Sequence, residues 1–154
     1  MSTPSAHNLA RVALYAGLLA GALDIAAAIL LNLQVGPRVV LQSVATGWFG
    51  DAAYAGGWTT AGLGLASHFA IMLAFAVVFV AAAVVWPPVR RHWLAAGAVW
   101  GVAVWAVMTW VVVPLSASTL PAPDLPAAVQ GLVVHVLAVG LPMAFVARRM
   151  LPPA

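Results

Sequence analysis

Three ionisable side chains stand inside long apolar stretches of the sequence: Asp24, His68 and His135. A carboxylate or an imidazole removed from water needs a partner, so we expect all three side chains to face the interior of the folded protein. Both groups can exchange protons, bind metal ions and form strong hydrogen bonds. These three residues are therefore the candidate site of the chain.

Proton-linked transport is the first chemistry that these residues could support. Imidazole changes its charge near neutral pH, and a nearby aspartate could accept or release the same proton. Such a site would make the protein a small-solute or proton carrier. Because four helices alone enclose little volume, a carrier of this size is expected to form a homo-oligomer.

Cofactor binding is a second possibility. His68 and His135 could be the two axial ligands of a haem, with space for the macrocycle at Gly64 and Gly131, one turn before each histidine. The same two histidines together with Asp24 could instead hold a divalent metal as a two-histidine, one-carboxylate set. A purely structural role is also open, because interhelical hydrogen bonds between such residues contribute about 0.6 kcal/mol each.

The composition identifies the solvent around these residues as a lipid bilayer. Hydrophobic residues make up 65% of the chain and charged residues only 6%, against about 25% charged in a typical soluble domain. The basic residues are all arginines, and they lie singly or in pairs at the ends of apolar runs. Since no basic stripe with interleaved aromatics exists, a nucleic-acid partner is not expected.

Four apolar runs are long enough to cross a bilayer, and we expect one membrane domain over residues 1–154. The expected spans are 12–33, 58–86, 93–113 and 126–147, with a short amphipathic helix at 37–47 in the interface and an N-cap at Asp124. The first run is longer than a signal peptide's apolar region and contains Asp24, so we expect it to remain in the mature protein. The predicted fold class is all-α, a four-helix up-and-down transmembrane bundle of two hairpins.

The arginines predict the orientation of this bundle. Five of the six fall on one side of the four-span arrangement, and only Arg38 falls on the other. The positive-inside rule makes the five-arginine side cytoplasmic, with both termini on it. At 1.5 Å of rise per residue, the three candidate site residues would all lie roughly 12 to 14 Å below the outer surface, near the midplane.

Glycines mark the expected helix contacts, because small residues let membrane helices approach closely. Pairs four residues apart occur in the first span, Gly17 with Gly21, and in the third, Gly97 with Gly101. The second and fourth spans share the pattern G-L-x-x-H, which ends at His68 and His135. Together these matches predict a duplicated hairpin with a pseudo-two-fold axis along the membrane normal.

A further function class is an accessory subunit that packs against a larger membrane complex. The third span offers an aromatic surface for this, made of Trp93, Trp100, Trp105 and Trp110. An enzyme is not expected, because no nucleophile and base stand at a recognisable spacing and the chain has no glutamate. All of these interpretations share one partner, the lipid bilayer.

The stretch YAGGWTTA from Tyr54 to Ala61, continuing to His68, carries a resemblance to known proteins. The same pattern extends into the last span, at Gly131-Leu132, His135, Gly140 and Pro142. In these motifs the chain resembles a group of small uncharacterised bacterial inner-membrane proteins, and more loosely the YagU-type inner-membrane proteins. The resemblance implies a multi-pass protein of the bacterial inner membrane, and it assigns no catalytic residues.

Overall fold

The computed structural model describes residues 5–152, and this part of the chain is helical with no β-strand. The helices differ in their hydrogen-bond pattern: η1 is a 3₁₀ helix, η2 and η3 are π-helical, and the others are α-helices. In chain order the elements are α1 (Ala6–Leu31), α2 (Gly36–Phe49), η1 (Gly50–Gly56), α3 (Gly57–Val85), α4 (Pro88–Arg91), α5 (Trp93–Val107), η2 (Met108–Val112), α6 (Val113–Leu115), α7 (Leu125–Val134), η3 (His135–Gly140) and α8 (Leu141–Met150).

Four continuous helical stretches are long and apolar enough to cross a membrane. They are Ala6–Leu31, Gly36–Val85, Trp93–Leu115 and Leu125–Met150. The first begins six residues earlier than the predicted 12–33 and ends two residues sooner. The second contains three helices, α2, η1 and α3, with no non-helical residue between them. The predicted segments 37–47 and 58–86 therefore belong to one continuous run of helical residues, which changes direction at its junctions.

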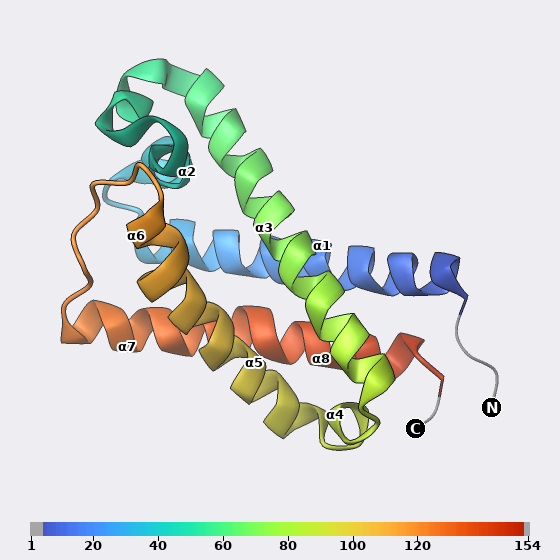
Figure 1. The fold of residues 1–154 in the computed structure, drawn as a ribbon. Helices are drawn as coiled ribbons and strands as arrows, with labels where there is room; N and C mark the ends of the chain where they lie inside the picture. The colour runs from blue at the N-terminus through green and yellow to red at the C-terminus, as the bar shows by residue number, and fades with distance from the viewer. Residues whose placement is uncertain (1–4, 153–154) are drawn as a thin grey trace.

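The long helices form a bundle in which α1 occupies a central position. It packs against α3 on one side and against η3 and α8 on the other, while α5 packs against η3 and α8. Figure 1 shows both ends of the described chain and α4 at one end of the bundle, with α2 and α6 at the other. The buried residues of α1 are mostly small and recur every three to four positions: Val12, Ala13, Ala16, Gly17, Ala20, Gly21 and Asp24.

The short helix α2 packs against the first turns of α3, and its sequence predicts an apolar face made of Val40, Leu41, Val44 and Trp48. That face is only partly inside: Val40 is 8% exposed but Trp48 is 69% exposed, whereas Gln42 and Thr46 are each 1% exposed. The polar residues are inside because they bond to nearby backbone and hydroxyl oxygens. The carboxamide Nε2 of Gln42 donates to the Gly57 carbonyl at 2.9 Å and contacts three further acceptors.

The segment between α2 and α3 is helical, although its Asp51 and its glycines predict a loop. It forms the 3₁₀ helix η1, and a glycine with positive φ stands at each of its junctions, Gly50 at 54° and Gly57 at 59°. Residues with side chains rarely adopt this conformation. The two glycines therefore make the reversals that return the chain from α2 to α3.

The last two membrane-length stretches, Trp93–Leu115 and Leu125–Met150, are each interrupted by a π-helical segment just before a proline. Pro114 follows η2, and Pro142 follows η3. Proline lacks an N–H and its ring clashes with the carbonyl four residues earlier, so regular α-helical bonding fails at that point. The spans predicted at 93–113 and 126–147 therefore each contain an irregular turn that their apolar patterns do not indicate.

The start of α7 provides a local test of helix capping. Asp124 is the N-cap, and its Oδ1 accepts a hydrogen bond from the Ala127 N–H at 2.9 Å. Asp124→Ala should lower the free energy of unfolding by about 0.5 to 2 kcal/mol, whereas Asp124→Ser, which keeps a cap acceptor, should be close to wild type. Thermal unfolding in detergent measures both, and equal destabilisation of the two variants would contradict the capping role.

Candidate functional site

His68 lies on the buried face of α3 and is 7% exposed. Its Nε2 is 2.9 Å from the carbonyl oxygen of Gly21 in α1. A carbonyl only accepts, so Nε2 carries a proton and donates, while no residue of the described range bonds to Nδ1. His68 therefore joins α1 to α3 and still has one nitrogen free to accept a proton or a ligand.

Asp24 lies one turn along α1 from the glycine that receives the His68 hydrogen bond. It is 9% exposed, and none of the side-chain hydrogen bonds of the described range 5–152 involves its carboxylate, whose oxygens keep some accessible surface. Buried polar groups almost always have partners, and one without a partner calls for an explanation. The structure thus places a buried carboxylate and a buried imidazole on the packed faces of two adjacent helices.

His135 is placed differently. It is half-buried at the first position of the π-helical segment η3, and its Nδ1 donates to the Gly131 carbonyl of its own helix at 2.8 Å. Single π turns inside helices are frequent at functional sites. Within residues 5–152, however, no three histidine, cysteine or acidic residues lie close enough to form a metal-ligand group. The two-histidine, one-carboxylate set is therefore not assembled in this conformation.

The space expected for a haem beside Gly64 and Gly131 is filled by protein. Gly64 lies directly against the carbonyl of Leu41 in α2, and a Cβ on Gly131 would meet the indole of Trp105 at 3.2 Å. The Nε2 of His68 is also already bonded to Gly21. In this conformation each of the two glycines permits close packing and does not border an open space.

The four glycines of the paired motifs mediate contacts within each hairpin. A Cβ on Gly17 or Gly21 would meet Leu73 or Phe69 of α3 at 2.8 Å. In the second hairpin, Gly97 faces Gly140, and Gly101 faces Val136. These close approaches agree with the role predicted for small residues in membrane helix packing.

The two sets of contacts have the same register. A shift of 80 residues converts positions 17 and 21 into 97 and 101, and a shift of 67 residues converts 69 and 73 into 136 and 140. The shift of 67 residues also takes His68 to His135 and Gly64 to Gly131. The packing register thus matches the weak G-L-x-x-H pattern, as a duplicated hairpin predicts.

A cavity of about 610 Å³ opens beside the first half of α3, and neither Asp24 nor His68 is among its lining residues. Its walls come from α2, α3 and the segment from η2 to residue 120, and they include Trp48, Ser67 and Ile71. Ser67 directly precedes His68, and its hydroxyl accepts a hydrogen bond from Trp48 Nε1 at 2.9 Å. No sequence pattern indicates this cavity, because its walls come from segments far apart in the chain.

A second feature that sequence reasoning did not find is a group of arginines around one cavity. Arg90 and Arg91 of α4 and Arg148 and Arg149 of α8 line a space of about 740 Å³. In the sequence these residues only indicated orientation.

Comparison with family models, with curated proteins and with solved structures finds no match to the chain.

Proposed function

We propose that this chain is an integral protein of the bacterial inner membrane with four spans in an up-and-down arrangement. The support is the distribution of side-chain size: small residues are buried between the helices, and large apolar ones cover the outside. This is the arrangement that lipid permits and water opposes. Trp58 and Trp86, near the two ends of α3, are 67% and 65% exposed, as tryptophans at headgroup depth would be.

The proposed orientation has α4 and both termini on the cytoplasmic side. Arg90, Arg91, Arg148 and Arg149 line one cavity and so share one end of the bundle, which is the end at which the described chain begins and finishes (Figure 1). Arginine-rich ends face the cytoplasm. Helix α2 then lies at the outer end, where it covers the start of α3 as an interfacial helix.

We infer that the activity of this membrane protein is the carriage of a proton or a small cationic solute, without enzymatic chemistry. The observation that carries this inference is the placement of Asp24, a residue only 9% exposed whose carboxylate has no hydrogen-bond partner among the described residues. Ionisable residues at such depth in a membrane span mark ion and proton pathways. A proton or a cation would supply the missing partner.

His68 would serve as the second group of this site. Its Nδ1 can accept a proton while Nε2 remains bonded to the Gly21 carbonyl. Asp24 follows Gly21 by three residues, so Asp24 and His68 lie in the same layer of the bundle. A proton bound by either of these two side chains changes the charge of that layer.

Flux measurements in proteoliposomes test the carrier function. Vesicles that contain the purified protein and a trapped pH-sensitive dye should acidify after an external pH drop faster than empty vesicles. Asp24→Asn should reduce this rate to that of empty vesicles, because the amide neither ionises nor takes up a proton. His68→Gln, which keeps a donor for Gly21 but cannot titrate, should also slow the flux.

Asp124→Asn is the matched control, since it makes the same chemical change at an exposed helix cap. It should leave the flux unchanged. Flux that is equal in wild type and in Asp24→Asn would refute the carrier function. A structural role for Asp24 and His68 would then remain, and co-purification of a stoichiometric partner in mild detergent would point to an accessory subunit.

A further inference from the structure

The end of the bundle that we place in the cytoplasm contains a cavity with positively charged walls. Four of the six arginines in the sequence surround a space of about 740 Å³, together with apolar residues such as Leu151 and Pro87. Of the described residues that line it, none is acidic. The four guanidinium groups therefore create a strongly positive space without a counter-charge from its lining.

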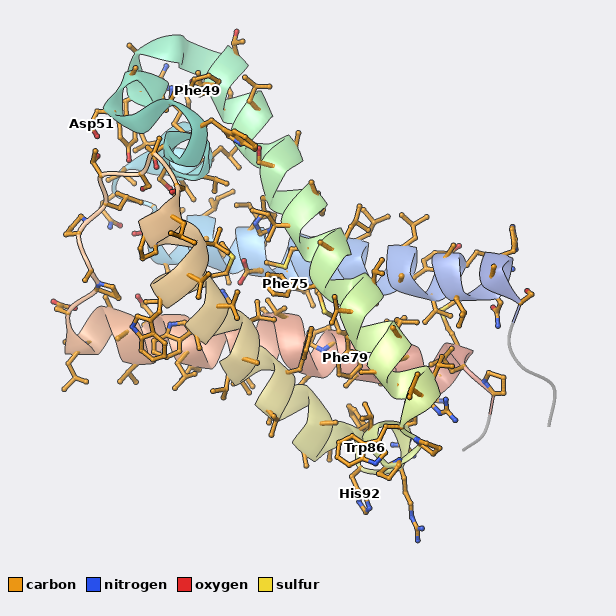
Figure 2. All side chains as sticks on the ribbon, in the orientation of Figure 1. Phe49, Asp51, Phe75, Phe79, Trp86 and His92 are labelled. Atoms are coloured by element: carbon orange, nitrogen blue, oxygen red, sulfur yellow. The ribbon has the colours of Figure 1, made fainter. Side chains whose placement is uncertain are left out.

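The acidic side chains of the sequence do not supply that counter-charge. The sequence contains only three acidic side chains. Asp24 lies inside α1, Asp124 caps α7, and Asp51 is near α2 at the opposite end from Trp86 and His92 (Figure 2). An anion from outside the described residues 5–152 is the group that these arginines lack.

Contacts with aromatic rings hold two of the arginines in place. The guanidinium of Arg148 lies 5.3 Å from the ring centroid of Trp93, and that of Arg149 lies 5.3 Å from the ring centroid of Phe145. The two rings contact each other, with centroids 5.9 Å apart. Cation–π stacking of this kind orients a guanidinium and leaves its N–H groups available.

Arg90 is anchored from the other wall. Its Nη1 donates to the Ala83 carbonyl at 2.7 Å, while its Nε is buried and has no hydrogen-bond partner in the described chain. A buried N–H without an acceptor is costly, and a bound anion is one of the explanations for it. Arginine is also the residue best suited to phosphate, because its planar fork donates two parallel hydrogen bonds.

We propose that this cavity binds the headgroup of an anionic phospholipid. The site would prefer a headgroup with two phosphodiesters, as in diphosphatidylglycerol, because α4 and α8 each supply a pair of arginines. Trp93, adjacent to the cavity, stands at the depth where headgroups lie, and basic pockets on the cytoplasmic side are suited to such lipids. This inference rests on the proposed membrane placement and does not depend on carrier activity.

Lipid titration of the full chain, purified in detergent, tests the site. Native mass spectrometry would measure the affinity for diphosphatidylglycerol, phosphatidylglycerol and phosphatidylcholine, with inorganic phosphate as the soluble probe. The expected order of affinity is diphosphatidylglycerol, then phosphatidylglycerol, then phosphatidylcholine, with inorganic phosphate far weaker. Equal affinity for all three lipids would overturn the proposal, and so would inorganic phosphate binding as tightly as the best lipid.

Paired variants separate this cavity from general surface charge. Arg91→Gln combined with Arg149→Gln should weaken diphosphatidylglycerol binding by about 100-fold, or about tenfold for each bidentate arginine replaced. Arg11→Gln combined with Arg38→Gln removes the same charge from residues outside the cavity and should leave the affinity within about threefold of wild type. An equal decrease in affinity for the two pairs would overturn the proposal.

A third pair, Arg91→Lys with Arg149→Lys, keeps the charge and removes the guanidinium forks. An affinity between those of wild type and the glutamine pair is expected.

The lipid order of the wild type tests the site even if a variant fails to fold. A detergent-soluble protein without lipid selectivity would refute this site alone, whereas a protein that is monodisperse without detergent would refute the membrane placement as well.

Discussion

Gly64→Ala is expected to lower the free energy of unfolding by about 2 to 3 kcal/mol, whereas Gly62→Ala should be neutral or slightly stabilising. The two glycines are two residues apart on α3 and differ in what a methyl group would meet. At Gly64 the added Cβ would run into the carbonyl of Leu41, which is backbone and cannot rotate away. At Gly62 nothing lies within 4 Å of the added atom.

The measurement is the thermal or denaturant unfolding midpoint of the purified protein in one detergent, followed by tryptophan fluorescence. Gly62→Ala controls for the helix propensity of alanine, which is more favourable than that of glycine by about 1 kcal/mol. The difference between the two variants therefore isolates the contact between α2 and α3. Equal midpoints for the two variants would show that α2 does not pack against Gly64.

Much of this architecture could be predicted from composition and spacing. The apolar runs indicate four long helices, because a segment of about 20 apolar residues has few alternatives to a membrane helix. The glycine pairs indicate the close contacts within the hairpins, since small residues four apart form one smooth face. Asp24 and His68 are buried, as expected of ionisable groups that lipid would exclude.

Other features depend on partners that no local pattern reveals. The buried side of α2 is set by Gln42 and Thr46, whose partners lie in η1, in α3 and in the loop near Ser118. Hydropathy alone assigns these polar side chains to the outside. The arginine cavity combines α4 and α8, which lie almost fifty residues apart in the chain.

The hydrogen-bond partner of His135 also differs from what the sequence pattern predicts. Its match to His68 in the G-L-x-x-H pattern predicts equivalent roles, and the packing register of the two hairpins does agree. Yet His68 bonds across to α1, whereas His135 bonds to the preceding turn of its own helix. The π-helical segment before Pro142 accompanies this difference, because an irregular turn changes the direction in which side chains project.

Gln42→Met is the second substitution with a large expected effect, a decrease of about 2 to 4 kcal/mol in the free energy of unfolding. Methionine matches the length of glutamine and fills the same space, but it has no donor. The Gln42 Nε2 contacts the carbonyls of Ala53, Tyr54 and Gly57 and the hydroxyl of Thr60, at 2.9 to 3.3 Å. Removing it takes away the donor that α2 contributes at the junction where η1 reverses the chain, and leaves the Thr60 hydroxyl as the remaining side-chain donor to the Ala53 and Gly57 carbonyls.

Two further variants separate the hydrogen bonds from packing. Gln130→Met makes the same change at an exposed position of α7 and should leave the midpoint of unfolding almost unchanged. Gln42→Glu retains the shape but replaces the donor by a second acceptor, so it should destabilise the protein more than Gln42→Met does. If Gln42→Glu were instead as stable as wild type, the carboxamide could not be the donor that joins α2 to α3.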